Sequence, residues 1–321
     1  MNTNWNDPNF QGFRGQNPFH REGHTPKPRK AVGTPFGRTV LNLAVTLVFA
    51  AAYFYVVLPP INLKAPEFYV FTLLVCGVYG LCAVMTSGFQ GDGVKGYFKF
   101  LKKQCLIPLA LAILLVVTAL VGSAVGWQVF RAGSYRDLLT VENGDFAAEV
   151  EEISFDQIPM LDKDSAAKLG NRKLGELADM VSQFEVADNY TQINYKGRPV
   201  RVTTLQYGDI IKWLNNRSAG LPAYLIIDMV TQNVEVVRLE EGIRYTPAEH
   251  FGRNLYRYLR FHYPTYLFDE PAFEIDEEGC PWWVCPRIDR TIGLFGGTDI
   301  TGAALVNAVT GETAYYDVAD I

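Results

Sequence analysis

Four arginines gather in a short stretch of the chain where they could hold an anion. Arg253, Arg257 and Arg260 recur at the spacing that puts side chains on one face of a helix, and Arg244 precedes them. Because a guanidinium binds phosphate and carboxylate through paired N–H donors, the pattern predicts an anion-binding strip for a phosphate, a carboxylate or an anionic wall polymer. The alternative is a solvated face paired with surplus carboxylates, and the acidity of this half of the chain favours that alternative.

Acidic side chains are the other candidates for chemistry. Asp228, Asp269 and Glu274 are the candidate acid–base residues if the chain is an enzyme. The carboxylates of residues 269–279 are oxygen ligands of the type that calcium prefers, but their spacing is not that of an EF-hand. The sequence contains no nucleophile-elbow motif. We therefore predict no metal site and no cofactor, and we assign no catalytic residue.

Cys280 and Cys285 predict two free thiols rather than a disulfide. Five residues of extended strand separate their Cα atoms by about 16 Å, whereas a disulfide allows about 7 Å. Their side chains also point to opposite faces of such a strand. No further Cys or His lies near enough in the sequence to complete a zinc site.

Charge is divided unevenly between the two halves of the chain. Residues 1–127 carry 11 Lys and Arg and 4 Asp and Glu, whereas residues 128–321 carry 18 and 30. The net charges are therefore +7 and −12, which give the −5 of the whole chain. This asymmetry indicates parts that lie in different environments, and the acidic half argues against nucleic acid as a partner.

Three uncharged apolar segments predict a membrane protein with three N-terminal transmembrane helices in residues 38–127. They lie at about 40–58, 68–87 and 106–127, and each has the length that crosses a hydrocarbon core. The segments contain no Asp, Glu, Lys, Arg or His, which argues against a pump or a proton relay. Gly122 and Gly126 form a close-packing motif, which we expect to join the three helices to one another.

The positions of Lys and Arg predict the orientation of these helices. The polar segment 1–37, which we expect to be a disordered cytoplasmic tail, is rich in Arg, and the loop between the second and third helices is rich in Lys. The loop between the first two helices has only Lys64, so the acidic half is expected outside the cell. If the second loop is a helix, its lysines could contact anionic lipid headgroups; the alternative is an ordinary cytoplasmic loop. These lysines are Lys95, Lys99, Lys102 and Lys103.

The rest of the chain reads as an acidic linker with a helix, 128–189, followed by a tandem α+β module, 190–321. The linker helix is expected to follow a cap at Asp164 or Ser165 and to present Leu174, Leu177, Val181 and Phe184. In the module, residues 190–242 and 273–318 each begin and end with a hairpin. A short helix separates the first two hairpins, and a glycine-rich stretch separates the second two.

Alignment of the two closing turns supports the tandem reading. It places residues 228–231 over residues 307–310. A helix over 246–263 joins the two units, with a capping box from Thr246 to Glu249 and an apolar stripe of Phe251, Leu255, Leu259 and His262. Since one hairpin pair leaves an apolar face uncovered, we expect the two units to close a single core together.

From the first apolar segment onward, the chain resembles an uncharacterised family of membrane-anchored bacterial proteins of Gram-positive type. The likeness lies in "YTQINYKGRPVRVTTL", "YGDIIKWLNNR", "GLPAYLIIDMVTQNVEVVRLEEG", "EHFGRNLYRYLRFHYPT" and "TIGLFGGTDI". Some relatives are labelled colicin V production-type membrane proteins. The closing hairpins are similar to those of PepSY modules, which bind or restrain partners outside the cytoplasm. The resemblance implies that the chain continues past "YYDVADI", and it transfers no catalytic residue.

The sequence leaves three functions open. The first is an envelope protein without enzymatic activity, in which the spans anchor an extracytoplasmic binding or interaction domain in the cell membrane. The second is a membrane-tethered enzyme acting on envelope material, which predicts a deep pocket with converging polar groups. The third is an accessory subunit of a membrane complex. A binding domain predicts a broad groove or an open sheet edge, and its expected partners are the lipid bilayer and an envelope polymer or another membrane protein.

Overall fold

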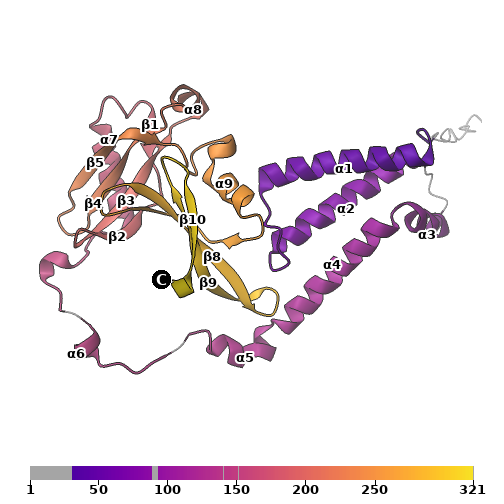
Figure 1. Cartoon of the computed structure of the whole chain (residues 1–321), viewed down its shortest axis with the longest axis horizontal. Coiled ribbons are helices and arrows are strands. Elements are labelled where there is room, and N and C mark those ends of the chain that lie inside the picture. Colours follow the sequence, from indigo (N-terminus) through magenta and orange to yellow (C-terminus); the bar gives the residue numbers. More distant parts are fainter. Residues whose placement is uncertain (1–30, 89–92, 140, 151, 321) are drawn as a thin grey trace, which may run out of the picture.

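The computed structural model describes residues 31–88, 93–139, 141–150 and 152–320. Figure 1 shows three long helices on one side and a β-rich region on the other. Helix α9 (Leu255–His262) and the hairpin of β8 (Pro281–Ile292) and β9 (Gly296–Asn307) lie where the two parts meet. The predicted disordered tail lies outside the described residues as far as residue 30.

Helices α1 (Pro35–Val57), α2 (Pro66–Ser87) and α4 (Leu106–Val125) are each long and apolar enough to cross a membrane. The three predicted helices are therefore confirmed in position, length and composition. Helix α1 begins at Pro35 rather than at residue 40, because Thr34 caps it by accepting a hydrogen bond from the Gly37 N–H. Most apolar side chains on these helices are exposed, as are Val48 at 70% and Ile107 at 81%.

Short helices connect these elements to the β-rich region. Helix α3 (Gly93–Gln104) joins α2 to α4, and α5 (Gln128–Arg136) follows α4. The acidic linker then contains α6 (Phe146–Glu149) and the 3-10 turn η1 (Phe155–Gln157).

The predicted linker helix exists but has different bounds. Helix α7 spans Lys163–Gly175, and its N-cap is Asp162, whose carboxylate accepts a hydrogen bond from the Ser165 N–H at 2.6 Å. The expected stripe through Phe184 is wrong. Phe184 instead begins β1 (Phe184–Val186), where it pairs with Tyr207 and is 6% exposed. Phe184 is therefore buried in a sheet and not on the apolar face of the predicted helix.

The first antiparallel sheet has the order β1-β3-β4-β5, with β2 beside the start of β3. Its strands are β2 (Thr191–Tyr195), β3 (Arg198–Tyr207), β4 (Leu221–Asp228) and β5 (Val234–Ile243), and α8 (Ile210–Asn216) follows β3. Both predicted hairpins and the short helix between them are confirmed. The sheet starts at residue 184 rather than at 190.

The second antiparallel sheet has the order β10-β9-β8-β6, with β7 beside the start of β8. Its remaining strands are β6 (Leu267–Phe268), β7 (Ala272–Ile275) and β10 (Thr313–Asp317), and the 3-10 turn η3 (Val318–Asp320) follows. The sheet begins at residue 267 rather than at 273. The glycine-rich stretch forms the tip of the long β8–β9 hairpin, where Gly293 has a φ of 64°.

The closing turns of the two sheets have the same pattern of internal hydrogen bonds. In the first, the Asp228 carboxylate accepts from the N–H groups of Val230 and Thr231 at 2.9 and 2.8 Å. In the second, the Asn307 side-chain oxygen accepts from the N–H groups two and three residues later, at 3.0 and 2.9 Å. Both are turns in which a short polar side chain binds nearby backbone, which explains why Asp and Asn occupy this position.

We expect Asp228→Asn to keep the first turn, because the Asn307 side-chain oxygen accepts the same hydrogen bonds in the second turn. Asp228→Ala should lose the turn, because alanine has no acceptor. Burial pushes the pKa of Asp228 upward, but the N–H groups of Thr231 and Val230 with the nearby Arg198 outweigh burial and lower that pKa. Ionised Asp228 therefore stabilises the fold above its unfolded pKa of about 3.9, and this contribution disappears as the pH falls through the folded pKa.

The measurement is the free energy of unfolding of the detergent-solubilised chain between pH 3 and pH 7. Asp228→Ala should lose about 1–2 kcal/mol at pH 7. Asp228→Asn should lose less and should show a shallower acid slope than the wild type. Equal losses from Asn and Ala would contradict this account of the turn.

The predicted joining helix starts later than residue 246. Helix α9 begins at Leu255, its N-cap is Asn254, and the 3-10 turn η2 (Phe251–Arg253) precedes it. The predicted capping box is wrong, because the Glu249 side chain is 2% exposed and accepts from Tyr207 of β3 and Trp213 of α8 rather than from the start of a helix. Of the predicted stripe, Leu255 and Leu259 are buried, whereas Phe251 and His262 are exposed.

Both sheets contribute to one hydrophobic core. Trp283 of β8 is 1% exposed, and its Nε1 donates to the backbone oxygen of Tyr245 at 2.8 Å. Tyr224 of β4 packs against Phe273 of β7, and its hydroxyl donates to the Gly279 oxygen at 2.8 Å. Buried side chains from β3, β4, β7, β8 and β9 belong to this same cluster. The two sheets therefore form one packed unit.

Candidate functional site

Two of the four predicted anion-binding arginines lie on the end of α1. Arg257 Nε donates to the Tyr55 oxygen at 3.1 Å, and its guanidinium lies 4.2 Å from the centre of the Tyr55 ring. Arg260 Nε donates to the Leu58 oxygen at 3.0 Å. These carbonyls belong to the C-terminal end of the helix, where a cation is favoured by the helix dipole. Helix α9 is thereby fixed to the end of α1.

The other two arginines lie elsewhere. Arg253 Nη1 donates to the Arg217 oxygen at 2.8 Å, and Arg244 is 3.7 Å from the Glu241 carboxylate. The structure thus brings Arg253 and Arg257 to cavities that share residues, whereas Arg244, which follows β5, lines neither of them. Of these four arginines, Arg244 alone forms a salt bridge among the described residues. Anion binding by the four stays a prediction.

The loop between α1 and α2 also contacts the β-rich region. Lys64 Nζ lies 2.8 Å from the Asp289 carboxylate and from the Arg290 oxygen. The Ile61 N–H donates to the Pro264 oxygen at 2.8 Å. The β-rich region is therefore bound at the ends of the helices that this loop connects.

The sequence predicted that Gly122 and Gly126 join the three long helices to one another, but both glycines lie against the β8–β9 hairpin. A Cβ at Gly122 would lie 2.6 Å from Leu294, and one at Gly126 would lie 3.0 Å from the Ile292 oxygen. Both glycines make room for the tip of the β8–β9 hairpin. The neighbouring Phe295 stacks edge-on against Tyr69 of α2 at 5.6 Å. The hairpin tip therefore contacts both α2 and α4.

The four predicted membrane-surface lysines lie on α3, at the other end of the long helices (Figure 1). All four side chains are exposed, whereas Phe100 and Leu101 of the same helix pack against Ala83 and Cys105. Helix α3 therefore has one apolar face and one basic face. The basic side chains are Lys95, Lys99, Lys102 and Lys103.

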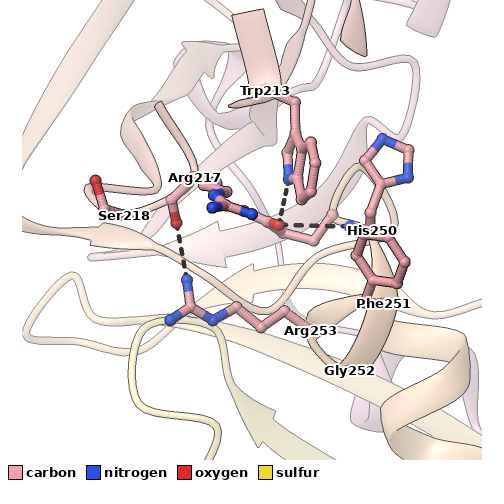
Figure 2. Close-up of a pocket in the computed structure, with 8 residues that line it drawn as sticks. Trp213, Arg217, Ser218, His250, Phe251, Gly252 and Arg253 are labelled. Atoms are coloured by element: carbon pink, nitrogen blue, oxygen red, sulfur yellow. Dashed lines mark hydrogen bonds between the residues drawn. The ribbon is translucent and has the colours of Figure 1, made fainter. Parts of the chain in front are cut away.

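A pocket of about 410 Å³ lies between α8 and η2. Figure 2 shows Trp213 at its centre, with His250 and Phe251 on one side and Arg253 reaching the backbone of Arg217. The Trp213 ring meets the His250 ring edge-on at 4.7 Å, and the Arg217 guanidinium lies 5.7 Å from it. We call this cavity the α8 pocket.

A buried carboxylate holds the α8 pocket in shape. Glu249 accepts hydrogen bonds from Trp213 Nε1 and from the Tyr207 hydroxyl, both at 2.7 Å. Burial, followed by the hydrogen bond to Glu249, raises the pKa of Tyr207, so this hydroxyl stays a donor. The sequence pointed to Glu249 only as a helix cap, because no local spacing relates it to Trp213 or Tyr207.

We expect Glu249→Ala to destabilise the fold by about 2–3 kcal/mol, since it leaves two buried donors without an acceptor. Thermal unfolding of the solubilised chain measures this loss. The matched control is Glu312→Ala, which removes an exposed carboxylate from the closing turn before β10 and should change little. An effect of Glu249→Ala no larger than that of the control would contradict the assigned hydrogen bonds.

A groove of about 840 Å³ lies between the two sheets. Its walls are β5, the β2–β3 turn, the β7–β8 turn and the second closing turn, and its apolar residues include Tyr195, Tyr224, Val237 and Leu239. Charged residues of both signs border it, namely Lys196, Arg198, Arg238, Glu235, Glu240, Glu241 and Glu278. We call it the inter-sheet groove.

The candidate acid–base residues do not converge. Asp228 holds a turn, Asp269 precedes β7, and Glu274 is on β7; none of the three lines the groove or the α8 pocket. Burial raises the pKa of Glu274. Within the described residues, no group of three His, Cys, Asp or Glu side chains is placed to hold a metal ion.

The two cysteines of the β-rich region differ in environment. Cys280 is exposed and lines the groove, and burial followed by the carboxylates of Asp276 and Glu278 raises its pKa. Cys285 is buried, which raises its pKa to about 12. Since the thiolate is the nucleophile, neither thiol is activated for covalent catalysis.

Comparison of the chain with family models, with curated proteins and with solved structures finds no match.

Proposed function

We propose that the chain is a membrane-anchored binding protein of the bacterial cell envelope, whose three spans hold a tandem two-sheet domain outside the cytoplasm. The inter-sheet groove is the observation that supports this most strongly. It is broad and open, and residues from both sheets line it. A groove of this kind suits a binding domain, whereas an enzyme would gather polar groups in a deep pocket.

The geometry of the helices supports the orientation that we propose. The domain binds the ends of α1, α2 and α4 through Arg260, Lys64 and the hairpin tip. The lysines of α3 lie at the opposite ends (Figure 1). If positive charge marks the cytoplasmic side, the domain faces away from the cytoplasm, as the family resemblance also implies.

An extended polypeptide of another envelope protein is the ligand that fits the groove best. Strand β5 pairs only with β4 among the described strands, so its other edge is open beside the groove. An open edge binds an extended chain through backbone hydrogen bonds, and the apolar side chains beside it select residues of the ligand. The equal sheet orders and closing turns support an internal duplication, in which the groove arose between the copies.

Photocrosslinking in intact cells tests this function. A benzophenone amino acid at Val237 or Leu239 lies in the groove, and one at Arg172, exposed on α7, is the control. We expect a discrete protein adduct from the groove positions and none from the control. Identical adducts from all three positions, or a carbohydrate adduct in place of a protein, would rule out a peptide-binding groove.

A further inference from the structure

The α8 pocket opens onto the surface of α1. A second cavity of about 540 Å³ shares Trp213, Arg217, His250 and Phe251 with it and is also lined by Tyr55. Tyr55 lies in the last turn of α1, and Arg257 is bonded to its backbone oxygen. Tyr and Arg at the end of an apolar helix are typical of the membrane–water boundary. The two cavities together therefore lie at that boundary if α1 spans the membrane.

The rim of this combined cavity is apolar although it belongs to an acidic domain. Ile210, Ile211 and Leu214 of α8 are exposed by 53%, 66% and 50%, and Phe251 by 62%. On the α1 side, Val56 is 71% exposed. An apolar surface that continues from a globular domain onto a membrane helix is suited to hydrocarbon rather than to water.

Three guanidinium groups border the same cavity without a carboxylate partner among the described residues. Arg217 lies over the Trp213 ring, Arg253 donates to a backbone oxygen, and Arg257 donates to the oxygens of Tyr55 and Phe251. The contacts of all three guanidinium groups are therefore with neutral groups rather than with carboxylates. This is unexpected in residues 128–321, where carboxylates outnumber Lys and Arg by 30 to 18.

The one carboxylate in the lining forms no salt bridge with these arginines, so three guanidinium groups stand against one carboxylate. Glu249 is 2% exposed, and its oxygens accept from Trp213 Nε1 and the Tyr207 hydroxyl. The same carboxylate also accepts from the His250 N–H at 3.4 Å. The hydrogen bond to Glu249 fixes the orientation of the Trp213 ring, over which the Arg217 guanidinium lies.

We propose that this cavity binds the headgroup of an anionic phospholipid. Arg217, Arg253 and Arg257 hold the phosphate, and the acyl chains lie against α1 and the apolar rim of α8. A free phosphate would use the arginines but not the rim, which is why the site is assigned to a lipid. The inference rests on the proposed membrane anchorage of α1 and does not depend on the ligand of the inter-sheet groove.

The test is retention of lipid by the full-length chain in detergent, counted by native mass spectrometry. Phosphatidylglycerol and phosphatidylcholine of equal chain length are offered separately, with inorganic phosphate added in a third arm. We expect the wild type to retain phosphatidylglycerol in preference to phosphatidylcholine, and inorganic phosphate at the same concentration not to displace it. The variants Arg217→Gln and Arg217→Gln/Arg253→Gln should weaken retention by about tenfold or more, because each removes a charge-assisted contact.

The matched control is Lys168→Gln/Arg172→Gln, which removes the same charge from the exposed face of α7 and should retain lipid like the wild type. Three outcomes would overturn the proposal: equal retention of both lipids, equal loss in the control, or displacement by inorganic phosphate. Loss of a co-purifying protein from the Arg217 variants with lipid retention unchanged would assign the cavity to a protein partner instead. Carbonate extraction of membranes from the same cells reports on anchorage separately.

Discussion

Replacement of Trp283 by alanine should destabilise both sheets at once, by about 3–5 kcal/mol. Trp283 fills the core that the sheets share, and its Nε1 bonds to Tyr245, which connects them. Hydrogen exchange of the solubilised chain measures the effect in each sheet separately. Peptides from β4 in the first sheet and from β9 in the second should lose protection together, since a shared core opens as one cooperative unit.

The neighbouring Trp282 supplies the control. It is only partly buried, its Nε1 donates to the Asp276 carboxylate at 3.0 Å, and it lies on the other face of β8. Trp282→Ala should cost about 1 kcal/mol. If Trp283→Ala left β4 fully protected while β9 exchanged freely, the sheets would be two independent domains and the groove between them would have no fixed shape.

The second large effect concerns the hairpin tip on α4. The double variant Gly122→Ala/Gly126→Ala places two methyl groups against Leu294 and the Ile292 oxygen. Because backbone at Ile292 has little room to move, we expect the tip to detach at a cost of about 1–3 kcal/mol. Hydrogen exchange over residues 292–297 should then become about tenfold faster or more.

Gly77→Ala/Gly80→Ala is the matched control, because a Cβ at either position of α2 meets no atom within 4 Å. It should leave exchange at the tip unchanged. Adding Leu294→Ala to Gly122→Ala removes the side chain that clashes and should restore part of the protection. Equal exchange in both double variants would show that the glycines do not hold the hairpin.

Features that depend on neighbouring residues could be predicted from the sequence. The uncharged segments predicted α1, α2 and α4, and alignment of the closing turns predicted that Asp228 and Asn307 occupy equivalent positions. The hairpin that begins residues 190–242 was also predicted, and the structure closes it with a two-residue loop in which Lys196 and Gly197 have positive φ, 52° and 74°. Each of these signals is contained within a few consecutive residues.

Features that depend on distant residues were missed. Glu249 looks like a helix cap, but Trp213 and Tyr207, 36 and 42 positions away, supply its donors. Arg257 and Arg260 look like a free basic face, but carbonyls 202 positions away accept from them. Gly122 and Gly126 look like a helix–helix contact, and the motif itself does not tell whether a helix or a hairpin approaches. Local patterns identify small, cationic or acidic positions but not their partners.

The location of the two-sheet domain outside the cytoplasm is the central claim, and Cys280 offers a direct test of it. Of the five cysteines, Cys280 is the exposed one on the domain, whereas Cys285 is buried and the others lie in or beside the long helices. Intact cells are treated with a membrane-impermeant maleimide at pH 8, because the raised pKa of this thiol leaves less of the reactive thiolate at neutral pH. The account predicts labelling of the wild type in intact cells and its loss in Cys280→Ser. Labelling that occurs only after the cells are opened would contradict it.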